Sequence, residues 1–185
     1  MEEFHYDLKI PRERIAVLIG KDGKIKKDIE HQTKTKITVD SKEGDIFITG
    51  NDGLNIYNAK VVISAIGRGF NPEIAMLLLH TDYVLEMVNI SEFSKKSKET
   101  LIRLKGRVIG KEGKSRKLIE ELSECHISIY GKTVSIIGSA ESVGIARQAI
   151  ESLLMGSPHA NVYKFLEKKR REIKKMKIIG ERRID

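Results

Sequence analysis

Two glycine pairs at matched spacing are the residues in this sequence with the clearest chemical use. Gly20 and Gly23 lie three residues apart within Ile-Gly-Lys-Asp-Gly-Lys, and Gly110 and Gly113 lie three apart within Ile-Gly-Lys-Glu-Gly-Lys. Glycines so placed allow a tight turn and let the backbone of a ligand approach closely. A helix beginning at the second glycine also directs its unpaired N–H groups and positive dipole end to that turn. Such a loop favours an anion, and phosphate is the natural candidate.

Two other patterns suggest catalysis but do not complete a site. Residues 113–115, Gly-Lys-Ser, resemble the end of a nucleotide-binding P-loop, but that pattern needs another glycine at position 108, where the chain has Val108. Cys125 and His126 are neighbours, yet in a strand their side chains would face opposite sides. We find no acid–base pair either, so the sequence predicts no enzymatic activity.

Metal and cofactor sites are not predicted. Asp40, Glu43 and Asp45 gather at an expected hairpin, where a solvated turn is favoured over a metal site. The single cysteine excludes an internal disulfide framework, and the five histidines have no metal-ligand spacing. The sequence therefore predicts no metal and no cofactor.

The two loops belong to an internal repeat with an offset of 90 residues. Residues 17–29 correspond to 107–119, and the match continues outward through the strands and a closing helix. Each copy reads strand, helix, loop, helix, strand, strand, helix. The predicted first strands are 4–10 and 83–90. The predicted helices after the loops are 24–33 and 114–123, and the closing helices are 54–66 and 143–154.

The repeat sets the expected domain organisation. We predict one domain over residues 1–70, an ordered connector over 71–82, a second domain over 83–160, and a basic C-terminal helix or tail over 161–185. The connector contains the apolar run Ile74 to Leu79, which is too apolar for a free linker. We therefore expect it to form a short helix buried between the two domains, holding them in a fixed relation.

The charge of the chain is concentrated at its end. The 185 residues include 34 Lys or Arg and 26 Asp or Glu, a net charge of +8, and the residues from Lys164 onward contribute +6 of it. Apolar residues at helical spacing indicate a basic amphipathic helix there, which can dock by its apolar face and contact phosphates with its basic face. The longest apolar run is far shorter than the ~20 residues that span a bilayer, so we expect a soluble, cytoplasmic protein.

The paired loops and the order of elements resemble the K-homology (KH) RNA-binding domain. The resemblance implies an α+β fold of two tandem type I KH domains, each a β-α-α-β-β-α unit with a three-stranded antiparallel sheet covered by helices. It also implies that each loop binds the backbone of single-stranded RNA and that an aliphatic groove takes the bases. In the first copy the implied RNA-binding residues are Ile19, Gly20, Lys21, Asp22, Gly23, Lys24, Lys27 and Ile37. In the second copy they are Arg107, Ile109, Gly110, Lys111, Glu112, Gly113, Lys114, Arg116 and Ile127.

Two features of the loops depart from the simplest form of this pattern. Asp22 and Glu112 place a carboxylate inside each loop, and we expect both to point away from a bound phosphate. Ser115 stands where the first copy has Ile25, so the second groove is expected to be less apolar or its helix to pack differently.

Over nearly its whole length the chain also resembles the archaeal relatives of the "partner of Nob-one", or Dim-two, family of rRNA-processing factors. The passage from Leu154 to Tyr163, with a Gly-Ser-Pro turn before the basic helix, is the most specific feature. The resemblance implies binding near the 3′ end of small-subunit rRNA, with a Nob-type endonuclease and the alpha subunit of translation initiation factor two as partners, and we predict that the protein is a monomer. The alternative is a KH subunit of an RNA-degrading or mRNA-regulating complex.

Overall fold

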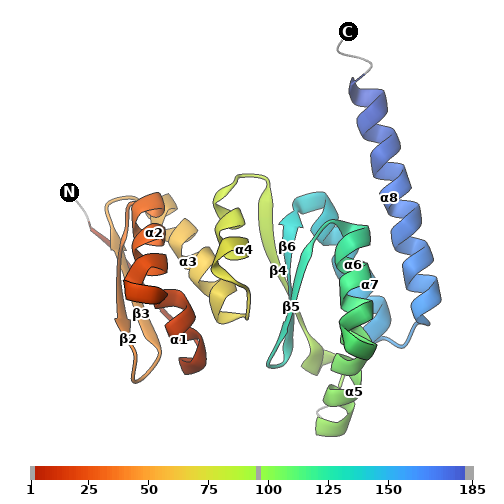
Figure 1. The fold of residues 1–185 in the computed structure, drawn as a ribbon, viewed down its shortest axis with the longest axis horizontal. Helices are drawn as coiled ribbons and strands as arrows, with labels where there is room; N and C mark the ends of the chain where they lie inside the picture. Colours follow the sequence, from red (N-terminus) through yellow and green to blue (C-terminus); the bar gives the residue numbers. More distant parts are fainter. Residues whose placement is uncertain (1–2, 95–96, 182–185) are drawn as a thin grey trace. The chain divides into compact units, whose positions relative to one another are not determined.

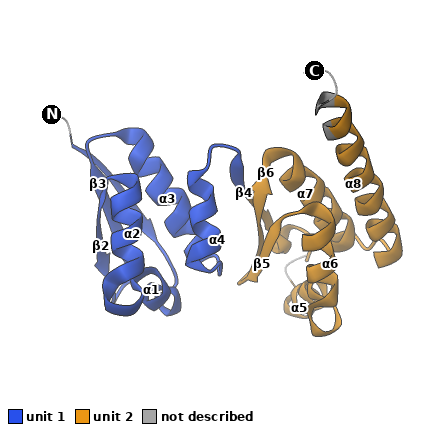
Figure 2. Ribbon diagram, turned by 45° about the horizontal axis from the view of Figure 1, so that its top comes forward, with its two compact units in different colours: residues 1–85 blue, residues 86–185 orange. Residues whose placement is uncertain are grey.

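The computed structural model describes residues 3–94 and 97–181, which form two compact units, Met1–Leu85 and Glu86–Asp185 (Figure 2). Each unit contains one three-stranded sheet with helices packed against it (Figure 1). Both follow the β-α-α-β-β-α order, so the predicted α+β class and the tandem repeat are confirmed. In the part of the chain described, no helix combines the length and apolarity that a membrane span requires.

Unit 1 builds its core between the sheet and the three main helices. Its elements are β1 (Phe4–Lys9), α1 (Arg12–Ile19), α2 (Lys24–Thr33), β2 (Lys36–Asp40), β3 (Asp45–Gly50) and α3 (Gly53–Gly67). The strand order is β1-β3-β2, with β3 antiparallel to both neighbours. Because side chains alternate along a strand, Ile46 and Ile48 of β3 point to one face, where they are fully buried with Leu18 of α1 and Ile29 of α2.

The connector forms a short helix, as expected, but it starts earlier than the apolar run. Helix α4 (Pro72–Met76) begins at Pro72, and a 3₁₀ turn follows over Leu77–Leu79. Proline suits the first helical position because it has no N–H to leave unpaired. The segment buries Ala75 and Leu78 and packs on α3, within unit 1. Its expected role in holding the two units in a fixed relation stays a prediction.

Unit 2 repeats the same plan with one addition. Its sheet begins with β4 (Tyr83–Asn89), which crosses the boundary between the units at Leu85. The other elements are α5 (Lys98–Ile109), α6 (Lys114–Ser123), β5 (His126–Tyr130), β6 (Thr133–Ser139), α7 (Ala140–Leu154) and α8 (His159–Glu181). The strand order is β4-β6-β5. Helices α2 and α6 have the predicted bounds. The basic helix α8 is confirmed through residue 181, whereas residues 182–185 lie outside the described part.

Helix α8 packs on α6 and α7 and buries Val162 and Leu166 (Figure 1). The repeat shows why unit 2 accepts this helix. Leu118 and Leu122 of α6 occupy the positions at which α2 of unit 1 has Asp28 and Gln32. These two substitutions turn a polar outer face into an apolar one, which a further helix can cover.

Candidate nucleic-acid interface

Each Gly-x-x-Gly loop joins two helices through the same unusual backbone. In unit 1, α1 ends at Gly20 (φ 71°, ψ 178°), a 3₁₀ turn follows over Lys21–Gly23, and α2 starts after Gly23 (φ 74°, ψ 14°). In unit 2 the matching values are φ 72°, ψ 175° at Gly110 and φ 75°, ψ 11° at Gly113. These positive φ angles are the ones that favour glycine. The repeat therefore conserves a loop geometry as well as a sequence.

The first glycine of each loop is also required by space. A Cβ on Gly20 would lie 2.4 Å from Ile25 Cγ1, and a Cβ on Gly110 would lie 2.6 Å from Ser115 Cβ and 2.7 Å from its backbone nitrogen. Ser115 is buried, and its small side chain lets the backbone of α6 come closer to the loop than Ile25 allows in unit 1. The helix thus packs differently, which is one of the two outcomes expected for this substitution.

The middle residues of the loops take the left-handed conformation without being glycine. Asp22 has φ 55° and Glu112 has φ 54°, and both side chains are exposed. Oε2 of Glu112 lies 4.0 Å from Nζ of Lys114, and both side chains of this ion pair are more than 70% exposed. Exposed pairs of this kind contribute at most about 1 kcal/mol, so Lys114 can exchange this partner for a phosphate. The expectation that both carboxylates point away from a bound phosphate stays a prediction.

The helices that leave the loops have uncapped N-termini. In the described residues, the side chains of Asp52, Ser97 and Ser139 accept hydrogen bonds from the first turns of α3, α5 and α7. No side chain does so for α2 or α6, whose N-cap residues are Gly23 and Gly113. The positive end of each of these helices therefore stays open to an anion from outside the chain.

Lysines surround both open helix ends. Lys21, Lys24 and Lys27 in unit 1, and Lys111, Lys114 and Lys117 in unit 2, are exposed. Apart from the pair at Lys114, no ion pair within the described residues engages any of the six. The loops thus combine open backbone donors with available cations, which is what phosphate binding needs.

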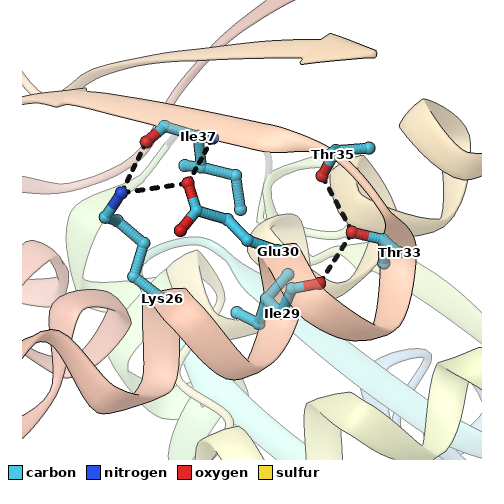
Figure 3. A network of polar contacts seen from close by, with 6 residues as sticks. All are labelled: Lys26, Ile29, Glu30, Thr33, Thr35 and Ile37. Atoms are coloured by element: carbon cyan, nitrogen blue, oxygen red, sulfur yellow. Dashed lines mark hydrogen bonds and ion pairs between the residues drawn. The ribbon is translucent and has the colours of Figure 1, made fainter. Parts of the chain in front are cut away.

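A polar network joins α2 to the edge of the sheet beside the first loop (Figure 3). Lys26 Nζ donates to Glu30 Oε1 (3.0 Å) and to the carbonyl of Ile37 (2.8 Å), and the N–H of Ile37 donates to Glu30 Oε1 (2.7 Å). Ile37 itself is buried. Its backbone is therefore held by α2, and its side chain belongs to the core.

Unit 2 repeats the bond between the glutamate and the strand but not the bonds of the lysine, since Arg116 Nε has no hydrogen-bond partner in the described residues. The N–H of Ile127 donates to Glu120 Oε1 (2.8 Å), and Arg116 Nε lies 3.7 Å from Glu120 Oε2. Ile127 is buried like Ile37. Five other aliphatic side chains on these helices and strands remain partly accessible, namely Ile19, Ile25 and Val39 in unit 1 and Ile109 and Ile129 in unit 2.

Arg107, a predicted RNA contact, is engaged inside the protein. Its Nε donates to the carbonyl of Leu153 (2.9 Å) and its Nη2 to that of Ser157 (2.6 Å), so the guanidinium binds the end of α7. The carbonyl of Arg107 lies 2.8 Å from Nε2 of His159, the first residue of α8. Unit 1 has an analogous contact, in which Arg14 donates to the carbonyls of Ile66 and Phe70 at the end of α3. The sequence alone did not predict this contact.

Comparison with known families covers both units. Residues 5–65 match the KH domain model, and residues 84–171 match the model of the second KH domain of PNO1, described as a eukaryotic-type KH domain, type I. A KH domain-containing protein of Methanocaldococcus jannaschii is 49% identical over 172 residues, which are 91% of this chain and 75% of the relative. The chain belongs to the PNO1/Dim2 family of KH-domain proteins.

Solved structures agree with this family assignment. Dim2p of Pyrococcus horikoshii is 47% identical, with a TM-score of 0.83, and the match covers 89% of this chain and 99% of that one. A structure described as an a/eIF2alpha–aDim2p–rRNA complex of the same organism is 45% identical, with a TM-score of 0.85, and covers 92% of this chain and 96% of that one. The pre-rRNA-processing protein PNO1 of Coccidioides immitis is 30% identical to this chain over 139 residues. The match covers 73% of this chain and 54% of the relative.

Proposed function

We propose that this protein binds the single-stranded 3′ end of small-subunit rRNA and acts as a ribosome assembly factor. The observation that carries the proposal is the repeated loop, in which an uncapped helix N-terminus meets exposed lysines. The family supports the choice of RNA, because its eukaryotic members are pre-rRNA-processing proteins and a solved archaeal relative is described in a complex with rRNA.

In this mechanism each loop holds a phosphate and each groove holds bases. The N–H groups at the start of α2 or α6 bind the phosphate oxygens, with the adjacent lysines as counter-charges. The aliphatic side chains beside each loop, such as Val39 and Ile129, cover the faces of the unstacked bases. The phosphate contacts position the strand, and the groove distinguishes its sequence.

Four of the predicted site residues have a supporting role in this proposal. Ile37 and Ile127 form the core beneath the groove, and their backbones are held by Glu30 and Glu120. Arg107 joins α5 to the end of α7, and Arg116 lies against Glu120. The other thirteen predicted residues remain in the proposed interface.

The protein does no chemistry itself in this proposal. It acts as a cytoplasmic, monomeric, non-catalytic RNA-binding factor, with the predicted domains 1–70 and 83–160 as its two RNA-binding modules. The alpha subunit of translation initiation factor two, present in the complex of the Pyrococcus relative, is a protein partner. A Nob-type endonuclease, implied by the family resemblance, supplies the cleavage.

Charge-reversal variants test the proposal. Lys21→Glu and Lys111→Glu each reverse one loop charge, and Lys36→Glu, on an exposed strand position away from the loops, is the matched control. We expect each loop variant to weaken binding to the 3′-terminal rRNA segment by about tenfold or more, and the control to have little effect. Equal losses in all three variants would show diffuse electrostatic binding. Equal affinity for a scrambled RNA would favour the alternative, a general KH subunit.

A further inference from the structure

Helix α8 leaves an open groove beside the C-terminal end of α6. The groove has a volume of about 360 Å³ and is lined by Leu122, Glu167, Arg170, Arg171 and Lys174. Small-ligand sites have volumes of about 300–1,000 Å³, so this groove is large enough to be one. Leu122 and the aliphatic stems of the long side chains give it an apolar surface, and three cations against one carboxylate give it positive charge. We call it the α6–α8 groove.

The groove exists because α8 packs tightly only along its first half. Val162 and Leu166 are 3% and 0% exposed. Ile173, two turns further on, is only half-buried, and Met176 is 69% exposed. The second half of the helix therefore stands away from the body of unit 2, and its cationic side chains border open space.

Arg170 has an unsatisfied donor at this place. Its Nε is buried and has no hydrogen-bond partner among the described residues. The carboxylate with which it pairs, that of Glu124 just after α6, lies 4.0 Å away and belongs to a side chain that is 56% exposed. A buried donor without an acceptor is unfavourable, so Arg170 is a group that a ligand can satisfy.

The α6–α8 groove lies at the end of a path that starts at the second Gly-x-x-Gly loop. Helix α8 begins beside this loop, because Nε2 of His159 lies 2.8 Å from the carbonyl of Arg107, three residues before Gly110. Helix α6 begins at the loop and ends beside Arg170, which pairs with Glu124. Since α6 has ten residues, the groove lies about 15 Å from the loop.

Exposed cations follow this path. Lys164, Lys168 and Arg171 are spaced at i, i+4 and i+7, so they lie on one face of α8, and Lys117 is exposed on α6. Because Arg171 lines the groove, this row of charges ends there. Lys168 has Glu172 3.9 Å away, but an exposed pair of this kind contributes little. A phosphate backbone that leaves the loop therefore meets positive charge as far as the groove.

The chemistry of the groove suits a base as well as a phosphate. Proteins bind unstacked RNA bases by stacking them on aromatic rings or on the planes of arginine guanidiniums. In the described part of the chain no aromatic ring lines the groove, and two guanidiniums stand in its place, those of Arg170 and Arg171. Arg170 is only 32% exposed, so its guanidinium is held in position as a stacking surface must be. Unit 1 has no equivalent, since Gln32 stands there at the position of Leu122.

We propose that the α6–α8 groove binds a nucleotide that flanks the RNA segment held by the second loop, with the base stacked on Arg170 and the phosphate contacted by Arg171 and Lys174. The inference rests on the proposed function. It adds to it a nucleotide site beyond the two loops and their grooves, and it gives α8 a role in holding a base as well as charge.

The length and base content of the RNA test this site without changing the protein. Fluorescence anisotropy compares a short RNA of about four nucleotides, the number that a Gly-x-x-Gly loop clamps, with RNAs extended on the 5′ or the 3′ side. We expect one of the two extensions to raise the affinity about fivefold or more, and abasic residues in that extension to remove most of the gain. A gain that survives the abasic residues would show contact with the backbone alone and would overturn the proposal.

Substitutions at Arg170 separate stacking from charge. Arg170→Lys keeps the charge but not the planar guanidinium, and Arg170→Gln removes both. The charge-matched control is Lys36→Gln, at an exposed position on β2 of unit 1. We expect both Arg170 variants to lose the gain from the extension, and Arg170→Lys to keep the wild-type salt dependence. Both should bind the short RNA as the wild type does, which also shows that unit 2 remains folded, and the control should keep the gain.

Three results are decisive against these expectations. A full gain in Arg170→Lys would overturn the proposal, because a point charge would then be sufficient. Absence of a gain from either extension in the wild type would also overturn it and would leave the groove to another ligand, such as an acidic peptide. Wild-type protein that does not bind even the short RNA would instead reject the proposed function on which the inference rests.

Discussion

The four loop glycines allow backbone strain to be separated from steric clash, because the structure gives them two different environments. Gly20 and Gly110 combine φ near 71° with ψ near 180°, a conformation that only glycine adopts readily. Gly23 and Gly113 lie in the ordinary left-handed region. Replacing each in turn with alanine should therefore give a graded series of stabilities.

The magnitudes follow from what the new methyl group meets. At Gly23 and Gly113 it meets nothing closer than 3.8 Å, so the cost is the left-handed conformation alone, about 1 kcal/mol. At Gly20 the strain rises to about 2–3 kcal/mol, and the methyl group meets Ile25 Cγ1 at 2.4 Å and Ile25 Cβ at 2.9 Å; side-chain rotation relieves only the first contact, and the backbone nitrogen of Ile25 is farther away, at 3.1 Å. At Gly110 the contacts are with the Cβ and backbone nitrogen of Ser115, which cannot rotate away, so the total reaches about 4 kcal/mol or more.

Urea unfolding followed by circular dichroism measures this series. The expected order of destabilisation is Gly110→Ala, then Gly20→Ala, then Gly23→Ala and Gly113→Ala together. RNA binding by the Gly113 variant, measured in parallel, reports the effect of one methyl group on a loop whose fold is intact. Equal free energies of unfolding for the Gly110 and Gly113 variants would refute the reasoning, since they would show that α6 moves away from the loop without cost.

Three further predictions concern unit 2. Arg107→Ala should lower stability by about 1–3 kcal/mol because two carbonyls at the end of α7 lose a charged donor, whereas the salt dependence of RNA binding should not change. The substitutions Lys168→Gln, Lys174→Gln and Lys175→Gln neutralise three exposed lysines of α8. Together they should reduce the slope of log affinity for RNA against log salt concentration by about 2 if this helix contacts RNA, and an unchanged slope would reject that contact. Burial raises the pKa of the Cys125 thiol to about 11, so native protein should resist iodoacetamide at pH 8 and react once unfolded.

Substitution of the α8 lysines is a better experiment than removal of the helix. From the sequence, truncation after Tyr163 looks like a way to delete positive charge alone. In the structure Leu166 is fully buried, and α8 covers the apolar face of α6 that includes Leu122. Truncation would therefore expose core residues, and a change in RNA binding could not be assigned to charge.

Much of the fold could be predicted because the repeat supplies two independent readings of one unit. Helices α2 and α6 begin directly after the second loop glycine and end at the predicted residues, since both boundaries are set by local signals. The loop residues, too, were identified from spacing alone. Local backbone requirements of this kind are written directly into the sequence, as Gly20 and Gly110 show.

The parts of the site that could not be predicted depend on long-range contacts. Arg107 looks like one more cation beside the loop, and only the folded chain shows its guanidinium bonded to residues about 50 positions away. Ile37 and Ile127 look like groove residues, but the pleat turns their side chains inward, and Glu30 and Glu120 hold their backbones. In each case the residue type is compatible with RNA binding, and the contact seen in the folded chain supports the structural role that we propose for the residue.

The two copies of the repeat have diverged on their outer faces while keeping their loops. Unit 2 has leucines on α6, and α8 covers them; unit 1 has polar residues there and instead exposes Leu54 and Tyr57 on α3. Neither change touches the loop geometry, which agrees within a few degrees between the units. Because the loops are retained and the outer faces differ, the feature that the two units share is the loop that we propose binds phosphate.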